Sequence, residues 1–315
     1  MWGDRFWAHR ARPSRLRERL ADGEPLLAVE LRPPRRDLAG VHAMEAWIDV
    51  YHAVDKLSAG DTVVFLTDNA IGSNEEENLA HLVKNLGTRA VRERIVPFLT
   101  LKHPLEYCLR YGARARRENF PGLVVLGGDR HDGIPRCLPH ADGLRDILRR
   151  EQPGLLLGGW LNPYRDPVEQ VSFLEGHGDS LDFALTQVAS HHDLAPVAAL
   201  VAELARRNVT LPLFAGVFYY RSARPKTLGQ LARFIPVPAE GLARDFGERG
   251  LGPDAVAAAT VRGLGELGLT RFYVSNLPTS RAPAALGRIA ALAGIPDPLG
   301  APAPAGGAGN QGKQR

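Results

Sequence analysis

Glu30 is the residue of this sequence best placed for acid–base chemistry. It lies near the end of Leu26–Leu31, an apolar run with the length and composition of a buried strand. Two prolines end the run, because proline lacks the backbone N–H that a sheet ladder needs. A carboxyl group at such a position must be paired, solvated or kept protonated by a raised pKa. Glu30 is therefore a candidate general acid. The alternative is a structural ion pair with one of three nearby arginines: Arg32, Arg35 or Arg36.

Polar residues also follow the other predicted strands. In chain order they are Thr67, Asp68 and Asn69; Thr100, Lys102 and His103; Asp129, Arg130 and His131; Asn162 and Tyr164; Gln187; Tyr219, Tyr220 and Arg221; and Asn276. If the strands are parallel, their carboxyl ends meet at one end of a barrel, here called the mouth. Three carboxyl groups (Glu30, Asp68, Asp129) and the amide of Gln187, expected to be buried, would then face each other. Neighbouring carboxylates raise one another's pKa, which favours a protonated acid near neutral pH.

A metal site at the paired histidines is not expected from the sequence. His191, His192 and Asp193 are consecutive, and neighbouring loop residues rarely ligate the same ion. Asp193 is instead expected to cap the helix that follows it. A metal site at His131 and Asp132 is likewise not expected. Gly127 and Gly128 would let the backbone approach a phosphate or a planar ring, or would simply form a tight turn.

The elements that must position these residues alternate between strand and helix. Apolar runs predict strands at Leu26–Leu31, Thr62–Leu66, Ile95–Leu101, Gly122–Leu126, Leu155–Trp160, Leu181–Val188, Leu211–Val217 and Arg271–Ser275. Helical spacing and breakers predict helices at Arg10–Ala21, Val41–Leu57, Glu75–Leu86, from Pro104, Asp142–Glu151, Pro167–Glu175, Leu194–Arg207, Pro225–Phe234, Pro238–Phe246, Pro253–Leu267 and Ala282–Ala293. Eight strand–helix units predict a (β/α)8 barrel of the α/β class, and no GxGxxG follows a strand.

Composition is that of a folded protein with a substantial core. The 315 residues are 44% hydrophobic and 23% charged, with a formal net charge of +4. We expect a basic N-terminal helix within residues 1–22 that caps the barrel as an exposed segment, the barrel at 23–296, and a disordered Pro/Gly/Ala-rich tail at 297–315.

Charge and cysteine usage set the expected partners and compartment. Arginine is scattered, so nucleic acid is not an expected partner. Two cysteines without a CxxC favour a reducing, cytoplasmic setting. The basic N-terminus lacks an apolar region, so it is not expected to be a secretory signal, and no run is long enough to span a membrane. A homo-oligomer is left open.

In order along the chain, several motifs resemble those of the methylenetetrahydrofolate reductase family. Residues 29–35, V-E-L-R-P-P-R, are similar to the family's F-E-F-F-P-P-[KR]; residues 126–129, L-G-G-D, are similar to L-R-G-D. Weaker matches are Thr67 to V-T-Y-G, residues 98–100 to H-L-T-C, 185–187 to I-T-Q, 215–217 to P-G-I-x-P, 235–238 to V-x-I-P, and 272–276 to F-Y-T-L-N. The likeness extends from about Leu26 to Ile295.

The resemblance implies an oxidoreductase that reduces 5,10-methylenetetrahydrofolate with NAD(P)H through FAD. It implies that Glu30 is the general acid and that Asp129 lies beside the flavin and the pterin. Gln187, Asp129 and Tyr273 would bind the folate. The implied cofactor-binding residues are Thr67, Asp68, Thr100, Gly128, Asp129, Asn162 and Tyr164. The expected partner is a folate or pterin substrate.

The sequence also departs from the family pattern. It lacks the Lys-rich segment that holds the FAD phosphates, and losing cations removes charge-assisted bonds to a diphosphate. A flavin-independent relative that uses NAD(P)H or a deazaflavin therefore stays open. So do a non-catalytic pterin-binding accessory subunit of a methyl-transfer system and an unrelated barrel lyase or hydrolase whose Glu30, Asp68 and Asp129 bind Mg²⁺.

Overall fold

Eight strands form a closed parallel barrel in the order β1 to β8 in a computed structural model of the chain. The structure describes residues 15–34, 38–67, 91–128, 133 and 135–300. The strands are β1 (Leu26–Leu31), β2 (Val64–Leu66), β3 (Ile95–Thr100), β4 (Gly122–Leu126), β5 (Leu156–Leu161), β6 (Phe183–Ala189), β7 (Leu213–Phe218) and β8 (Arg271–Ser275). The barrel closes where β1 pairs with β8, with Leu26 opposite Arg271. The (β/α)8 prediction is confirmed.

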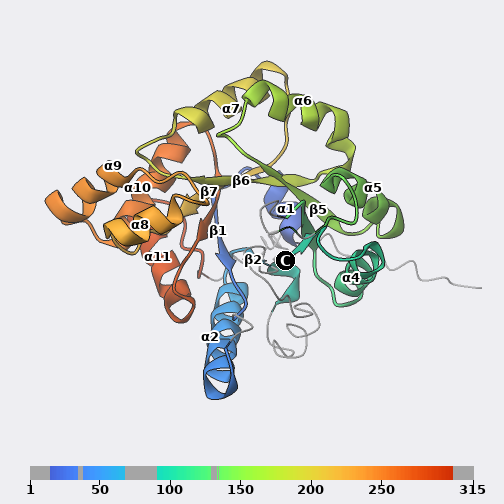
Figure 1. The fold of residues 1–315 in the computed structure, drawn as a ribbon, viewed down its shortest axis with the longest axis horizontal. Coiled ribbons are helices and arrows are strands. Elements are labelled where there is room, and N and C mark those ends of the chain that lie inside the picture. The colour runs from blue at the N-terminus through green and yellow to red at the C-terminus, as the bar shows by residue number, and fades with distance from the viewer. Residues whose placement is uncertain (1–14, 35–37, 68–90, 129–132, 134, 301–315) are drawn as a thin grey trace, which may run out of the picture.

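Helices surround the strands on all described sides (Figure 1). They are α1 (Arg15–Ala21), α2 (Gly40–Ala59), α4 (Leu105–Arg117), α5 (Ala141–Glu151), α6 (Pro167–His177), α7 (Ala195–Arg206), α8 (Pro225–Leu231), α9 (Ala239–Ala243), α10 (Pro253–Glu266) and α11 (Ala282–Ala293). Short turns are η1 (Arg92–Arg94), η2 (Gly178–Ser180), the π-helical η3 (Arg244–Glu248) and η4 (Thr279–Arg281). The helix expected at Glu75–Leu86 lies outside the described residues.

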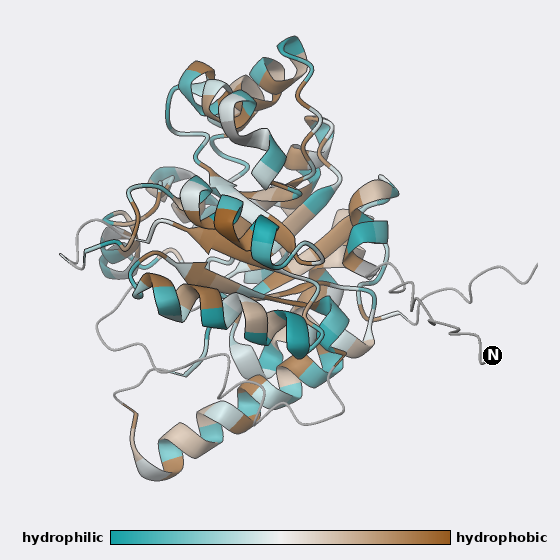
Figure 2. Cartoon of the chain, turned by 90° about the vertical axis from the view of Figure 1, so that its right-hand side faces the viewer, coloured by the Kyte–Doolittle hydropathy of each residue, from teal (hydrophilic) through white to brown (hydrophobic). Residues whose placement is uncertain are grey.

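Alternation along each strand divides the core into two layers. Outward-facing residues such as Val29 and Leu31 pack against the helices. Inward-facing residues fill the barrel, where the Phe65 ring contacts those of Phe98, Phe183, Phe214 and Tyr273. Figure 2 shows the strands as mostly hydrophobic and the helices as mixed. The interior is therefore a packed aromatic core rather than a channel.

Helix α1 caps the N-terminal end of the barrel, but it is not simply an exposed lead-in. Leu16 and Leu20 are 1% and 8% exposed and join the inner core. Arg271, the first residue of β8, donates hydrogen bonds to the carbonyl oxygens of Arg19 and Leu20. The Arg-rich pattern did not predict the burial of these two leucines, which close the barrel at the end opposite the mouth.

Other described residues pack against only part of helix α2. At 20 residues it is about 30 Å long, more than the adjacent barrel wall requires. Val54 and Leu57 in its second half are buried, whereas Val41, Met44 and Ile48 in its first half are exposed. Figure 1 shows this helix projecting from the barrel. Its apolar spacing thus predicted the helix correctly but not the burial of its N-terminal half.

The predicted tail begins too early at residue 297. The carbonyl of buried Pro298 accepts a hydrogen bond from the Asp61 N–H at 2.8 Å, and Leu299 packs against the outer core. A Cβ on Gly60 would lie 2.4 Å from the Pro298 oxygen, so the glycine makes room for this contact. Residues 297–300 therefore belong to the barrel.

We expect a chain ending at Gly300 to keep the melting temperature of the full chain. A chain ending at Asp297 loses the Pro298 and Leu299 contacts, which should cost about 1–3 kcal/mol and several degrees of melting temperature. Thermal unfolding of the two truncated chains checks this. Equal melting temperatures would contradict the assignment of these residues to the barrel.

None of the helices among the described residues is long and apolar enough to cross a lipid bilayer.

Candidate functional site

Glu30 lies at the mouth, at the carboxyl end of β1, and only 8% of it is exposed. Its inward direction follows from the strand alternation, because Leu26 and Ala28 on the same face belong to the inner core. The Ser275 hydroxyl at the end of neighbouring β8 faces the carboxyl group and acts to lower its pKa. The Nε atom of Arg32 lies 3.6 Å from Oε1. Of the three arginines considered from the sequence, Arg32 is thus a partner; Arg35 and Arg36 lie outside the described residues.

Burial raises the pKa of the Glu30 carboxyl, and this effect outweighs the opposing attraction of Arg32. The Arg32 side chain is 51% exposed, so water screens much of its charge, whereas the glutamate is desolvated. Glu30 is therefore disposed to carry a proton at higher pH than an ordinary glutamate. Arg32 lies close to the carboxyl group but does not cancel the effect of burial on its pKa. Glu30 therefore stays a candidate proton donor.

Two buried threonines lie at the ends of the next two strands around the barrel from Glu30. Thr67 follows β2 and Thr100 ends β3; they are 8% and 0% exposed. Within the described parts of the chain, neither Oγ1 atom has a hydrogen-bond partner. A buried hydroxyl without a partner is unfavourable, so each is a candidate to bind a polar ligand group.

We expect Thr100→Val to leave the free energy of unfolding unchanged or to raise it by about 1 kcal/mol, because it removes an unsatisfied polar group. Thr62→Val is the matched control. Thr62 is equally buried, but its hydroxyl donates to the Leu27 carbonyl at 2.5 Å, so its loss should cost about 1 kcal/mol. Urea unfolding of both variants measures the contrast. A clear destabilisation by Thr100→Val would show that the hydroxyl is already satisfied.

Strand β6 changes register between Leu185 and Val188, and Gln187 lies within this irregularity, near the carboxyl end of the strand. Gln187 is half-buried rather than buried as expected, and its Oε1 accepts a hydrogen bond from the Val188 N–H. Its amide NH₂ group is the part suited to a ligand, because an amide nitrogen only donates. The Gln187 assignment as a folate contact stays a prediction.

Tyr273 does not lie where a substrate could reach it. It is 0% exposed, and its hydroxyl donates to the Thr186 carbonyl at 2.7 Å. Gly216 makes space for this ring, since a Cβ there would lie 2.7 Å from the Tyr273 hydroxyl. Burial, followed by the charge of Glu30, raises the pKa of Tyr273 well above its usual value. We correct the substrate-binding assignment: Tyr273 packs the barrel interior near Glu30.

Cationic side chains surround the glycine turn after β4. Gly128 has φ +74°, and a Cβ on it would meet the Lys102 side chain at 2.6 Å. Arg136 donates a hydrogen bond to the Gly128 carbonyl and lies where a Cβ on Gly127 would be. The glycines therefore leave room for two cations at the mouth. Such a pair suits an anionic group such as a phosphate.

Asn162 and Tyr164 are largely used by their own loop. The Asn162 side-chain oxygen accepts the Tyr164 N–H at 3.0 Å, and the Asn162 N–H donates to Gln170. The Tyr164 hydroxyl lies 3.5 Å from the Val188 carbonyl, and burial raises its pKa to about 12. These contacts show that both residues stabilise the turn after β5, and we do not assign them to cofactor binding.

The remaining carboxyl groups expected at the mouth, Asp68 and Asp129, lie outside the described residues, as do Asn69, Arg130, His131 and Asp132. Tyr219 and Asn276 bond to neighbouring elements: the tyrosine hydroxyl bonds to Asp254 on α10, and the asparagine amide donates to the Tyr219 carbonyl after β7. The described candidates at or after the carboxyl ends of the strands thus include Glu30, Thr67, Thr100, Lys102, Gly128 and Gln187.

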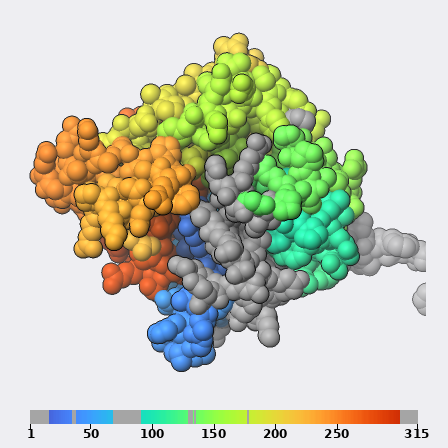
Figure 3. All heavy atoms as spheres, in the orientation of Figure 1, coloured from blue at the N-terminus to red at the C-terminus, as the bar shows by residue number. Residues whose placement is uncertain are grey.

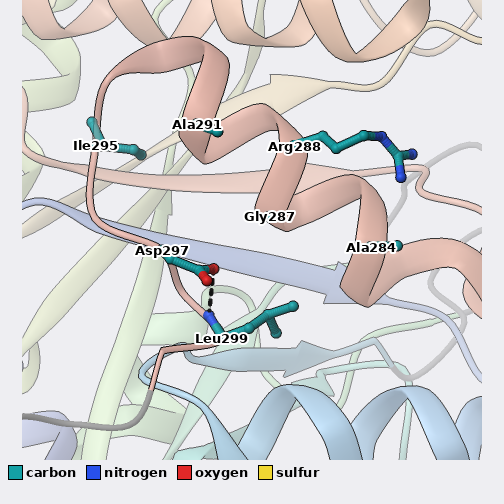
Figure 4. Close-up of a pocket in the computed structure, with 7 residues that line it drawn as sticks. All are labelled: Ala284, Gly287, Arg288, Ala291, Ile295, Asp297 and Leu299. Atoms are coloured by element: carbon teal, nitrogen blue, oxygen red, sulfur yellow. Dashed lines mark hydrogen bonds between the residues drawn. The ribbon is translucent and has the colours of Figure 1, made fainter.

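Two pockets open on the outer surface of the barrel. One, of about 340 Å³, lies between α11 and the turn at residues 297–299, lined by Ala284, Gly287, Arg288, Ala291, Ile295, Asp297 and Leu299 (Figure 4). The other, of about 450 Å³, lies beside α10 and includes Val261 and Phe272. Neither contains Glu30 or another residue expected at the mouth. The first pocket is bounded by the Asp297–Leu299 turn, so we regard it as a packing feature.

A cluster of His191, His192 and Asp245 is the arrangement that the sequence did not reveal. Because the two histidines are consecutive loop residues, the sequence did not predict that they share a partner, and Asp245 lies more than fifty residues further along the chain. Asp193 does not cap α7: the N-cap position is Leu194, and no side chain bonds there. Asp193 instead forms a backbone bridge with Ser190, which keeps the histidine loop tight.

Comparison with known proteins supports the fold alone. No model of a known protein family matches the chain. No curated protein sequence matches it either. Among solved structures, a complete multifunctional pyruvate carboxylase from Rhizobium etli is 16% identical with a TM-score of 0.51, over 91% of this chain and 27% of that one. The PgaB (BpsB) glycoside hydrolase domain from Bordetella bronchiseptica is 13% identical with a TM-score of 0.47, over 83% of this chain and 97% of that one.

The class of protein defined by these findings is the (β/α)8 barrel, with polar residues gathered at the carboxyl ends of the strands. The chain spans about a quarter of the pyruvate carboxylase that it matches. At such low identity, neither the carboxylase nor the hydrolase indicates what this chain does.

Proposed function

We propose that this chain is a methylenetetrahydrofolate reductase-like oxidoreductase, which reduces 5,10-methylenetetrahydrofolate to 5-methyltetrahydrofolate. One observation carries the proposal: Glu30, in the motif that resembles the family's first-strand motif, is a buried carboxyl group with a raised pKa at the mouth of a (β/α)8 barrel. This end of the barrel holds the active site in characterised enzymes of this fold.

The proposed role of Glu30 is proton donation. Its protonated carboxyl group would give a proton to a nitrogen of the folate's five-membered ring, and the C–N bond to that nitrogen would break. The remaining carbon–nitrogen unit becomes an electrophilic iminium ion, which accepts a hydride. Arg32 and the Ser275 hydroxyl would stabilise the carboxylate that is left, since both lower its pKa. The net reaction consumes one NAD(P)H and one proton.

A dinucleotide would bind beside this acid. Lys102 and Arg136 around Gly128 suit a diphosphate. The buried hydroxyls of Thr67 and Thr100, which have no hydrogen-bond partner among the described residues, suit the polar edge of a ring. A bound FAD would supply hydride transfer between NAD(P)H and the folate. Nicotinamide dinucleotides carry the same diphosphate and a polar ring, so this donor set fits either cofactor.

A magnesium-dependent reaction is less consistent with the geometry at Glu30. A cation ligand must be ionised, whereas burial favours the neutral form of this carboxyl group. Arg32 also places a positive charge 3.6 Å from Oε1. These two features favour a proton donor over a Mg²⁺ ligand at this position.

The test is an absorbance scan of the purified full chain before and after NADH or NADPH, followed by 5,10-methylenetetrahydrofolate. A flavin spectrum bleached by the nucleotide and restored by the folate supports the reductase with FAD. Folate-dependent oxidation of NAD(P)H by a colourless protein supports a flavin-independent reductase. Folate binding without turnover would contradict the reductase and support an accessory subunit.

A further inference from the structure

The strongest feature outside the proposed site is the cluster of His191, His192 and Asp245. The histidines lie in the loop that follows β6, and Asp245 lies in the π-helical turn η3, which follows α9. The segment from α8 to η3 forms the protrusion drawn in orange at the left of Figure 3. Two segments that are distant in sequence thus bring three potential metal ligands together.

Both imidazole rings converge on the same carboxylate oxygen. The Nε2 atom of His191 lies 2.9 Å from Oδ2 of Asp245, and the Nε2 atom of His192 lies 2.8 Å from it. The two ring centroids are 3.9 Å apart. The donor atoms all lie within 4.8 Å of one another. Consecutive histidines can therefore share one partner here, contrary to the expectation from their spacing.

The cluster is sheltered and built into the packing. Asp245 is 0% exposed, and the histidine side chains are 17% and 16% exposed. Gly241 on α9 allows His192 its position, because a Cβ there would lie 2.4 Å from the imidazole ring. Arg249 contacts the other oxygen of Asp245 at 3.3 Å, which leaves Oδ2 to the histidines.

Thr260 on α10 orients His191. Its hydroxyl lies 3.3 Å from the Val256 carbonyl, to which it donates, and it accepts the backbone N–H of His191 at 3.2 Å. With its hydrogen so used, the hydroxyl can accept from Nδ1 of His191, 3.1 Å away. In the tautomer that matches this network, Nδ1 of neutral His191 carries the ring proton and Nε2 does not.

With Nε2 of His191 unprotonated, this nitrogen and the Asp245 oxygen repel each other unless a positive charge lies between them. In that tautomer the lone pair of Nε2 points at the Asp245 oxygen 2.9 Å away. A metal ion between the two atoms would accept this lone pair and balance the carboxylate charge at once, and a neutral histidine is the form that binds metals.

We propose that His191, His192 and Asp245 bind a divalent transition-metal ion of the zinc type. Two imidazole nitrogens and one carboxylate oxygen are a donor set that such ions take, with a fourth position open to water. Zinc–ligand bonds of about 2.0–2.1 Å require tetrahedral donor separations of about 3.3 Å. The two nitrogen–oxygen separations of 2.8–2.9 Å would widen by about half an ångström, and all three donor atoms lie within 4.8 Å of one another.

The test is calorimetric titration of the untagged full chain with ZnCl₂, with CoCl₂ as a spectroscopic probe. We expect one equivalent to bind to the wild-type protein. Asp245→Asn and His192→Ala should each weaken binding by more than about 100-fold, because each removes a ligand. Thr260→Val should weaken it about 10- to 100-fold by releasing the His191 ring. His42→Ala, which changes an exposed histidine, is the matched control and should bind normally.

Thermal unfolding with and without ZnCl₂ provides a second readout. The wild-type protein should melt at a higher temperature with zinc, and the folded ligand variants should not. Because Asp245 is fully buried, its variant could fail to fold; His192→Ala, at a partly exposed position, then decides the question. No zinc uptake by the wild-type protein, or equal uptake by His192→Ala, would overturn the proposal.

Discussion

Glu30→Gln is expected to lower the turnover of methylenetetrahydrofolate by about 10²- to 10⁴-fold, because the amide keeps the shape of the side chain but has no acidic proton to give. Folate binding should change little. The Ser275 hydroxyl can still bond to the amide oxygen. The measurements are steady-state turnover and folate binding by calorimetry on the same preparations.

Glu203→Gln is the matched control. Glu203 is also a buried glutamate, 9% exposed, but it lies on α7 away from the mouth. Hydrogen bonds from Arg206 and Arg207 lower its pKa to about 2, so it is held ionised. This substitution can reduce stability but should leave turnover per folded molecule unchanged. Equal turnover of wild type and Glu30→Gln would remove Glu30 from the mechanism.

The raised pKa of Glu30 also has a consequence for stability. Between its unfolded and folded pKa values, the folded state binds more protons than the unfolded state, so stability falls as pH rises through that window. Glu30→Gln does not titrate there. The variant should therefore gain stability relative to wild type as pH rises above the usual glutamate range.

Phe65→Ala is expected to have the largest effect on stability, about 3–5 kcal/mol. Phe65 on β2 is 0% exposed, and its ring lies 5.1 Å from that of Phe214 in an edge-to-face arrangement. The rings of Phe98, Phe183 and Tyr273 lie 6.2–6.3 Å from it. Removing it leaves a cavity at the centre of a closed barrel, whose hydrogen-bonded strands cannot collapse inward.

Urea unfolding measures this effect, and Phe234→Ala is its control. Phe234 is 60% exposed, so its truncation should change the free energy of unfolding by no more than about 0.5 kcal/mol. A loss below 1.5 kcal/mol for Phe65→Ala would show that the inner layer is loosely packed.

The barrel was predictable from sequence because its strands are buried on both faces and separated by helical segments. Parallel pairing requires such crossovers, and continuous apolar runs such as Leu26–Leu31 mark strands covered on both sides. Glu30 stood out for the same reason, since a carboxyl group is unexpected in such a run. Sequence reasoning thus located the buried acid, whose burial and contacts with Arg32 and Ser275 the structure supplies.

Contacts between distant segments were not predictable. Asp245 reads as a surface residue of a short helix, and only the packing of η3 against the β6 loop brings it to His192. Tyr273 was assigned to the substrate because its strand resembles a family motif, yet alternation along β8 points it inward. The arginines around Leu16 and Leu20 suggested an exposed helix. Both leucines are buried because they cover the end of the barrel opposite the mouth, which the local sequence does not indicate.

The protonation state of Glu30 at neutral pH tests the central claim most directly. Infrared difference spectroscopy between wild type and Glu30→Gln isolates the bands of this one carboxyl group. We predict the carbonyl stretch of a protonated carboxylic acid in the wild-type protein, shifting to carboxylate bands only at higher pH. Carboxylate bands at neutral pH, with no protonated form, would show that Arg32 holds Glu30 ionised and that it cannot serve as the acid.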